Sequence, residues 1–329
     1  MISIGILGAA RIAPDAMIAP CRKRSDVSIV AVAARSLDRA RHFAGTHGIA
    51  LALDDYDALV RHPAIDLVYN ALPPVRHADL SIAALQAGKA VLCEKPFAMN
   101  AGEAETMVAA ARRSGGILIE AFHYRYHPVF RAVHGWVRTG RIGTVRRINA
   151  VFTVPIADTP GELRHDPRLG GGALMDLGCY PVHWIRTILG AEPVVRRAEA
   201  TMGKPGLDLA MAADLDGPDG ARARVTCSMA PDTPIEARLD IDGTAGSIRV
   251  QNPLAPHLGY RVETDFGTGP ESHTIDDQHT TYDHQLDAVL EVLAGRTAPL
   301  TGGSDALATM ALIDGIYRAA GLAPRGLKA

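Results

Sequence analysis

The first 121 residues alternate short apolar segments with amphipathic ones, and this rhythm constrains the fold more than any other feature of the chain. The apolar segments are rich in Val, Ile and Leu and lie at 2–7, 27–33, 66–72, 90–94 and 117–121. Helix-like segments separate them, at 14–22, 37–45, 56–61, 77–87 and 101–113. Continuous apolar strands joined by helices are typical of a parallel sheet covered on both faces. We therefore predict an α/β domain over residues 1–121.

The rest of the chain has a different pattern. One helical segment is expected over about 172–189, alternating strands from 194 to about 275, and two closing helices near 282–294 and 304–320. This pattern predicts an α+β domain over 122–329, built on a mostly antiparallel open sheet. Two domains also agree with the length of 329 residues, which exceeds one typical domain.

Composition narrows the class of protein. Hydrophobic residues make up 47% and charged residues 21%, which is ordinary for a soluble globular protein. The net charge of −2 provides no basic field, so neither nucleic acid nor an anionic membrane surface is an expected partner. No apolar run reaches the ~18 residues of a membrane span, and the N-terminus reads as a strand rather than a signal peptide. The well-separated cysteines favour reduced thiols and a cytoplasmic location: Cys21, Cys93, Cys179 and Cys227.

The loop after the first strand resembles a dinucleotide-binding turn. The pattern of such turns is G-x-G-x-x-G/A, and this chain has Gly8-Ala9-Ala10-Arg11-Ile12-Ala13, or G-x-A-x-x-A. The first glycine permits a tight turn, whereas Ala10 replaces the glycine that lets a pyrophosphate approach. Packing alone also produces such turns. Because the loop opens a strand–helix–strand unit, we expect the cofactor to contact Gly8, Ala9, Ala10, Arg11 and Ile12.

The end of the second strand indicates which nicotinamide cofactor is bound. NAD enzymes place an acid there for the ribose 2′-hydroxyl, whereas this strand ends in Ala33-Ala34-Arg35-Ser36. Arg35 can pair with a 2′-phosphate and Ser36 can donate a hydrogen bond to it. The alternative is that Arg35 is a solvated loop residue. We predict a preference for NADP, with NAD possible.

An acid and a base end the fourth apolar segment, at Glu94-Lys95-Pro96. Ligands of open α/β sheets bind at the carboxyl ends of strands, so Lys95 is expected beside the nicotinamide. Desolvation and a neighbouring cation both disfavour an ammonium group. Lys95 is therefore a candidate for proton transfer or for holding a substrate oxygen electrostatically.

The preceding apolar segment ends at the same edge of the predicted sheet. Leu72 and Pro73 are expected to form an apolar shelf there, and His77 opens the next helix. We expect these three residues to contact the cofactor, together with Glu94 and Lys95.

A narrow polar stripe runs along the helix expected over 172–189. At 100° per residue, Asp176, Tyr180, His183 and Thr187 fall within about 60° of one another, between apolar flanks. This arrangement favours a buried helix facing a cavity, and we expect His183 to contact the substrate. The alternative is an internal hydrogen-bond network. Pro181 weakens the geometry, because proline is tolerated best in a first turn.

Several blocks together resemble the glucose–fructose oxidoreductase and inositol dehydrogenase (Gfo/Idh/MocA) family. They are "IGILGAARIA", "NALPPVRHADLSIAALQAGKAVLCEKPFAMN", "EAFHYRYHP" and "GGGALMDLGCYPVHW", in that order, and "TTYDHQLDAV" and "ALIDGIYRAA" resemble the closing helices. The resemblance implies a Rossmann domain followed by an open sheet that often mediates oligomerisation, hence a homodimer or homotetramer. It also implies that Lys95 orients or helps deprotonate the reacting hydroxyl.

The family commonly carries Asp-x-Gly-x-His, with the histidine as acid/base, where this chain has Asp176, Gly178 and Tyr180. With tyrosine at this position, the chain resembles glucose–fructose oxidoreductase and the dimeric dihydrodiol dehydrogenases. Since an ordinary tyrosine has a pKa of ~10, a phenolate needs a nearby cation, which Lys95 and oxidised nicotinamide would supply. We expect Tyr180 to exchange a proton with the substrate, Lys95 to be its electrostatic partner and Asp176 to orient it.

Other polar residues give weaker signals. The resemblance implies that Arg125 faces the cofactor or substrate, and that His123, where relatives often have methionine, lies in the substrate pocket. Arg164 and His165 could hydrogen-bond a polyol, although a solvated loop is an equal alternative. His123 and His127 have no carboxylate or cysteine at ligand spacing, so no metal is expected.

These features predict an NADP-dependent oxidoreductase. It would move a hydride between nicotinamide C4 and a carbinol carbon of a sugar, polyol or vicinal diol, in the branch of the xylose and dihydrodiol dehydrogenases. Two alternatives remain open. One is a nicotinamide-dependent glycosidase with no net redox change, and the other is a non-catalytic nucleotide-sensing protein. Substrate identity and direction stay open.

Overall fold

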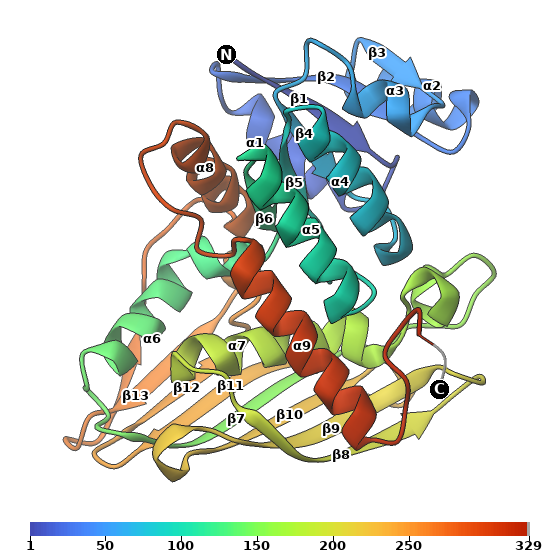
Figure 1. Ribbon diagram of the computed structural model, residues 1–329. Helices are drawn as coiled ribbons and strands as arrows, with labels where there is room; N and C mark the ends of the chain where they lie inside the picture. The colour runs from blue at the N-terminus through green and yellow to red at the C-terminus, as the bar shows by residue number, and fades with distance from the viewer. Residues whose placement is uncertain (328–329) are drawn as a thin grey trace. The chain divides into compact units, whose positions relative to one another are not determined.

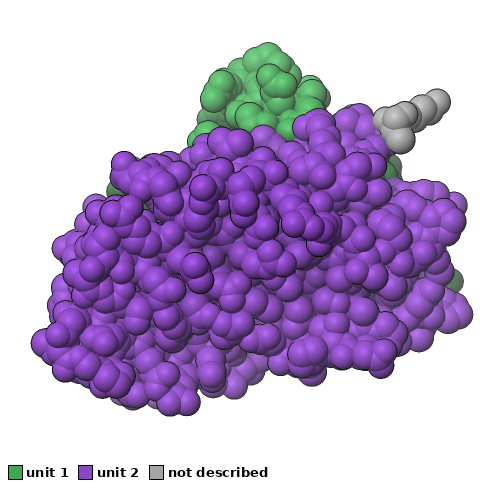
Figure 2. All heavy atoms as spheres, turned by 90° about the horizontal axis from the view of Figure 1, so that it is seen from below, with its two compact units in different colours: residues 1–123, 282–307 green, residues 124–281, 308–329 purple. Residues whose placement is uncertain are grey.

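The computed structural model describes residues 1–327, which form two compact units (Figures 1 and 2). Unit 1, green in Figure 2, comprises residues 1–123 and 282–307. Unit 2, purple, comprises residues 124–281 and the chain from 308 onward. The chain thus leaves unit 1 after residue 123 and returns to it for a segment that the sequence interpretation placed in the second domain.

Unit 1 contains a six-stranded sheet in which all paired neighbours are parallel. Its order is β3-β2-β1-β4-β5-β6, so the winding direction reverses between β1 and β4. The crevice at such a reversal is the usual ligand site of open α/β sheets. This confirms the predicted parallel α/β fold; only the short β3 was not expected. The strands are β1 Ile2–Leu7, β2 Val27–Ala33, β3 Leu51–Leu53, β4 Leu67–Asn70, β5 Ala90–Cys93 and β6 Leu118–Glu120.

Helices cover both faces of this sheet. One face packs against α1, α2 and α8, and the other against α3, α4 and α5. Side chains define the helix starts: Ser36, Asp55 and Asn100 accept hydrogen bonds from the first amides of α2, α3 and α5. The helices are η1 Pro14–Ile18 (a π-turn), α1 Ala19–Arg22, α2 Leu37–His47, α3 Tyr56–Val60, η2 Pro74–Arg76, α4 His77–Gln86, α5 Ala101–Ser114 and α8 Thr281–Leu293.

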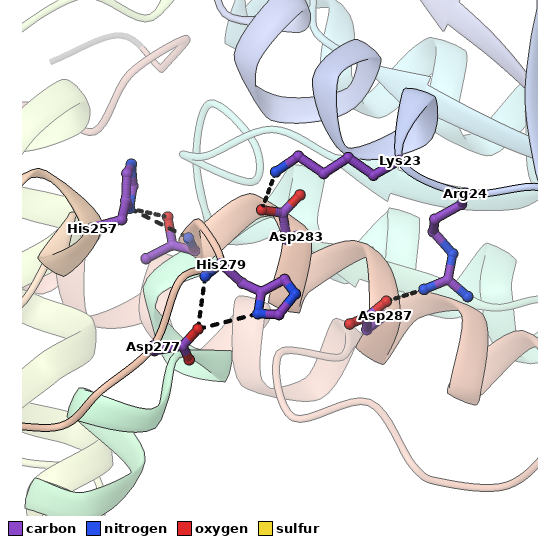
Figure 3. Close-up of polar contacts among 8 residues, drawn as sticks. Lys23, Arg24, His257, Asp277, His279, Asp283 and Asp287 are labelled. Carbon is purple, nitrogen blue, oxygen red and sulfur yellow. Dashed lines mark hydrogen bonds and ion pairs between the residues drawn. The ribbon is translucent and has the colours of Figure 1, made fainter.

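Helix α8 belongs to unit 1 because its apolar side completes the core of the sheet. Leu286, Val289, Leu290 and Val292 are buried in the cluster that contains the inward residues of β1, β4 and β5. Two ion pairs fix its outer side, Lys23 with Asp283 at 2.6 Å and Arg24 with Asp287 (Figure 3). Burial of this kind stabilises by ~1.5–3 kcal/mol per aliphatic side chain, far more than such part-exposed ion pairs.

Unit 2 contains an eight-stranded sheet in the order β14-β13-β12-β11-β7-β10-β9-β8. All neighbours are antiparallel except β7 and β10, which confirms the mostly antiparallel sheet. Helix α7 packs on β7 and β10. The strands are β7 Val145–Thr153, β8 Val194–Met202, β9 Asp208–Asp216, β10 Arg222–Ser228, β11 Glu236–Gly243, β12 Ser247–Gln251, β13 Arg261–Asp265 and β14 Pro270–His273.

A single regular helix was expected over 172–189, and the structure corrects this expectation. A π-turn, η6 Leu174–Gly178, comes first and α7 Cys179–Leu189 follows, so the 100° spacing does not hold across the whole segment. The sequence interpretation also missed α6 Pro128–Arg138 and β7. The last long helix, α9 Gly303–Ala319, follows close to its expected bounds. Among the described residues, no helix has the length and apolar character needed to cross a membrane.

Candidate functional site

The turn after β1 requires glycine at its first position. Gly8 has φ +99°, and a Cβ there would lie 3.2 Å from the carbonyl oxygen of Ala71 and 3.2 Å from the Leu72 side chain. The Gly8 amide donates to Ala33 at 2.8 Å, which joins the turn to the end of β2. The tight turn therefore lies at the β1/β4 reversal, and its shape fits close approach of a dinucleotide.

The rest of the turn leads directly into the first helical segment. Ala9, Ala10 and Ile12 are partly exposed and Arg11 is exposed, so a ligand at the crevice can reach them. Ala13 is fully buried, as close packing of the helix against the sheet requires.

A basic cluster lies beside this turn. Arg35 and Ser36 are exposed at the end of β2, and the Ser36 hydroxyl accepts a hydrogen bond from the Arg39 amide at 3.4 Å. The Arg39 guanidinium in turn donates to the carbonyl oxygen of Ala9 at 3.4 Å. Arg39 was not predicted, although its spacing from Arg35 places both at the start of one helix.

Two further residues extend the cluster. The Arg76 guanidinium lies over the Tyr56 ring, 5.5 Å from its centroid, and pairs with Asp79 at 2.8 Å. Burial raises the pKa of Tyr56, while the positive charges of Arg76, Arg35 and Arg39 act in the opposite direction. The three guanidinium groups thus share one neighbourhood, which suits an anionic group.

Lys95 follows β5 at the carboxyl edge of the sheet and is partly buried. Its neighbour Glu94 is fixed twice: a carboxylate oxygen accepts from the Tyr69 hydroxyl at 2.6 Å, and its amide donates to Asn70 at 2.9 Å. The Lys95–Pro96 peptide is cis. The predicted strand delivers Lys95 to the ligand-binding edge, one strand away from the β1/β4 crevice.

His77 has a different role from the one predicted. Its ring is fully buried, with Nε2 2.7 Å from the Leu72 carbonyl oxygen and Nδ1 3.0 Å from that of Pro96. Burial lowers the pKa of this imidazole. His77 therefore joins the loop after β4 to the loop after β5, and its complete burial leaves it no exposed surface for the predicted cofactor contact.

His123 lies against a residue from the far end of the sequence. Its ring centroid is 4.3 Å from that of Tyr282, the second residue of α8. Burial raises the pKa of Tyr282, and the carboxylates of Glu94 and Asp15 raise it further. Tyr282 therefore lies near the loop that carries Lys95. In the sequence, only the block "TTYDHQ" pointed to this residue.

Tyr180 belongs to unit 2 and is the second residue of α7, inside an aromatic cluster. Its side chain is 5% exposed, and its ring centroid lies 5.6 Å from Phe152, 6.1 Å from Tyr124 and 6.4 Å from Trp184. His183, 1% exposed, contacts the Tyr124 hydroxyl through Nδ1. The internal network left open from the sequence thus describes His183 better than substrate contact does.

The Asp176 carboxylate pairs with the Arg164 guanidinium. The carboxylate accepts from Arg164 Nε at 2.8 Å, and Arg164 also donates to Glu162 at 3.0 Å. The charge of Asp176 is the main reason that the pKa of Arg164 is raised. His165 is buried, with Nε2 2.8 Å from the Ile156 carbonyl oxygen. Arg164 orients Asp176, and His165 braces the loop instead of facing solvent.

Arg125 lies in unit 2 with its guanidinium 5.7 Å from the centre of the Phe130 ring. Burial, together with the charges of Arg125 and Arg138, lowers the pKa of His134 to about 4. The expected contact of Arg125 with cofactor or substrate stays a prediction.

Two family models match the chain. The one described as "Oxidoreductase family, NAD-binding Rossmann fold" covers residues 2–122, and the "GFO/IDH/MocA C-terminal domain" covers residues 130–249. Among curated proteins, the chain is similar to trans-1,2-dihydrobenzene-1,2-diol dehydrogenase of Xenopus tropicalis, with 35% identity over 76% of this chain and 75% of the relative. It is 31% identical to D-xylose 1-dehydrogenase (NADP(+)) 2 of Haloferax volcanii, over 96% of each protein.

Solved structures of similar proteins have the same fold. Aldose-aldose oxidoreductase from Caulobacter crescentus, complexed with glycerol, has a TM-score of 0.88 and 26% identity, with 97% of each chain covered. KijD10, a 3-ketoreductase from Actinomadura kijaniata solved with NADP and TDP-benzene, has a TM-score of 0.87 and 27% identity over 97% of each chain. With the Rossmann sheet, the mostly antiparallel second sheet and these matches, the chain belongs to the Gfo/Idh/MocA family of NAD(P)-binding oxidoreductases.

Proposed function

We propose that the protein is an NADP-dependent dehydrogenase or reductase acting on a carbinol or carbonyl carbon of a sugar, polyol or vicinal diol. The observation that carries this proposal is the presence of both reacting groups in settings that suit them. Lys95 follows strand β5 at the ligand edge of a Rossmann sheet, and Tyr180 lies in an aromatic cluster that is almost fully buried. The named activities of the diol, xylose and 3-keto sugar relatives support the same reaction class.

The cofactor fits the residues that would hold it. Gly8 leaves the space that a Cβ would fill, and no carboxylate ends β2, where Arg35 and Ser36 are exposed. When bound, nicotinamide accepts or delivers the hydride. The protein's own part is to place the substrate carbon and to manage the proton on its oxygen.

Three side chains are assigned to the proton transfer. Tyr180 exchanges a proton with the substrate oxygen as general acid or base. The Lys95 ammonium stabilises negative charge on that oxygen or on the phenolate. Asp176, held by Arg164 at 2.8 Å, orients the reacting hydroxyl. The 3-ketoreductase from Actinomadura kijaniata has been solved as variants in which a single tyrosine or a single lysine is replaced.

The basic cluster beside the turn predicts that the protein binds NADP more tightly than NAD. Replacing Arg35 or Arg39 with Ala should weaken NADP binding about ten- to a hundredfold and leave NAD binding nearly unchanged. A charge-assisted hydrogen bond contributes ~1.5–3 kcal/mol, and only NADP carries the 2′-phosphate. Fluorescence titration with both nucleotides measures the effect, and Arg41→Ala, an exposed arginine of α2, is the matched control. Equal losses for NAD and NADP would remove these arginines from the role.

The reaction is tested by mixing purified protein with NADP and a panel of aldoses, polyols and cyclic vicinal diols. We expect steady formation of reduced nicotinamide, followed by its near-ultraviolet absorbance, with at least one of them. Retained nucleotide with product formed from a glycoside, and no net reduction, would favour the glycosidase. Nucleotide binding without turnover of any panel member would favour the sensor.

The remaining proposals concern organisation and location. Residues 122–329 are proposed to bind substrate and to mediate a homodimer or homotetramer, for which sedimentation gives the mass. A cytoplasmic location is supported by the cysteines, which are buried and form no disulfide with one another: Cys21, Cys93, Cys179 and Cys227.

A further inference from the structure

Three segments of unit 2 meet at the guanidinium of Arg325, which lies beyond α9 and is only 6% exposed. Nε donates to the carbonyl oxygen of Gly171 at 2.7 Å, and Nη1 donates to that of Gly206 at 2.8 Å. Nη2 pairs with a carboxylate oxygen of Asp208, at the start of β9. The group also lies over the Tyr317 ring, 4.7 Å from its centre. Its hydrogen bonds thus connect three segments: the glycine loop (residues 170–172), the β8–β9 turn and the end of the described chain.

Asp208 continues this connection into the helix that follows the glycine loop. Its second carboxylate oxygen accepts from the Leu174 amide at 2.7 Å, at the first residue of η6. The Tyr317 hydroxyl donates to the other oxygen at 3.0 Å. Asp208 and Tyr317 are both fully buried, so water does not compete for these bonds.

Gly172 shows how tightly the loop is held. It has φ +129°, and a Cβ there would overlap both the Arg325 guanidinium and the Asp208 carboxylate. Only glycine fits this position. The glycines before η6 therefore allow the loop to lie against the Arg325–Asp208 pair.

The glycine loop leads directly into the helical segment that carries Asp176 and Tyr180. The Gly172 amide donates to Arg164 at 3.0 Å, and its carbonyl oxygen accepts from the Asp176 amide at 2.9 Å. Arg164 closes the set by donating to the Asp176 carboxylate at 2.8 Å. Tyr180 follows four residues later on α7. A displacement of the loop would therefore move Asp176 and Tyr180 together.

We propose that Arg325 and Asp208 are positioning residues for the reaction, which fix the start of the helix that presents Asp176 and Tyr180. This inference rests on the proposed role of Tyr180. A buried ion pair can often be replaced by apolar residues without loss of stability, so stability alone does not require arginine here. What requires arginine is geometry: its planar fork reaches three acceptors on two segments, the carbonyl oxygens of Gly171 and Gly206 and the carboxylate of Asp208. A lysine can supply the charge but not those directions.

The test uses Arg325→Lys and Asp208→Asn in the full-length protein. We expect kcat to fall about ten- to a hundredfold in each, because misplacement by about 1 Å can cost that much. The Kd for NADP should stay within about twofold, since the residues of the dinucleotide turn and of the basic cluster beside it belong to unit 1. Val250→Ala, a buried position on β12 of the same sheet, provides a variant with lowered thermal stability but an intact loop.

The outcomes separate positioning from stability. If Val250→Ala keeps its kcat while Arg325→Lys loses it at a similar melting temperature, the inference is supported. Wild-type kcat in Arg325→Lys, or an equal loss of kcat in Val250→Ala, would overturn it. Tyr180→Phe is measured alongside: full activity there would overturn the proposed function, whereas an inactive Tyr180→Phe with fully active Arg325→Lys would overturn this inference alone.

Discussion

Tyr180→Phe is expected to lower kcat by about a thousandfold while NADP binds as before. A positioned acid or base contributes ~10²–10⁴ in rate, and phenylalanine cannot exchange a proton. The phenyl ring should keep its place, because Phe152, Tyr124 and Trp184 surround it with their rings at 5.6–6.4 Å. Steady-state kinetics and nucleotide titration of the variant measure both quantities.

A control separates loss of the reacting hydroxyl from loss of any tyrosine hydroxyl. Tyr260 also lies in unit 2, and its hydroxyl donates to the Ile275 carbonyl oxygen at 2.9 Å. The Ile275 amide also donates to this hydroxyl, at 2.5 Å. Tyr260→Phe therefore removes two hydrogen bonds, each worth ~0.5–1.5 kcal/mol of stability, and should leave kcat unchanged. If Tyr180→Phe retained more than a tenth of wild-type activity, Tyr180 would not be the proton-exchanging group.

Lys95→Met is the second large effect, with an expected fall in kcat of about a hundredfold or more. Methionine has a similar length but no charge, so the variant loses the electrostatic stabilisation of the substrate oxygen or phenolate. Removing one such group from a preorganised site typically costs ~10²–10³ in kcat. Kinetics over a pH range, with substrate held at saturation, gives the measurement.

Lys89→Met is the matched control because Lys89 precedes the same strand, β5, at its amino end. Ligands of a parallel sheet bind at the carboxyl ends of the strands, so this substitution should leave kcat unchanged. A Lys95→Met enzyme with normal kcat and only weakened NADP binding would show that Lys95 holds the nucleotide and takes no part in the proton chemistry.

The elements of unit 1 could be predicted because each is encoded locally. Strands such as β1 and β5 are continuous apolar runs. Ser36 and Asn100 cap α2 and α5 by accepting hydrogen bonds from the helix amides. The three-residue β3 is too short to give a period. The place of α8 depends on tertiary packing, because an amphipathic helix does not reveal which core its apolar side will join.

Where a motif combines a turn or strand end with a reactive side chain, as at Gly8 and Lys95, the sequence predicted the place of the residue in the fold, and its contact with a ligand stays a prediction. His77 illustrates the limit: a polar residue at a helix start can contact a ligand or brace two loops, and only its complete burial decides between them. Arg325 and Asp208 lie 117 positions apart, and neither belongs to a motif, so no pattern in the sequence connects them. Their relation arises from the fold alone.

The most direct test of the account follows the hydride itself. The panel substrate that supports turnover is prepared with deuterium on its carbinol carbon and incubated with NADP and the wild-type enzyme, and the nucleotide is then analysed by mass and by NMR. The account predicts one deuterium at C4 of the reduced nicotinamide, on a single face of the ring. Reduced nucleotide without the label, or product formed with no labelled nucleotide at any stage, would contradict direct hydride transfer from substrate to cofactor.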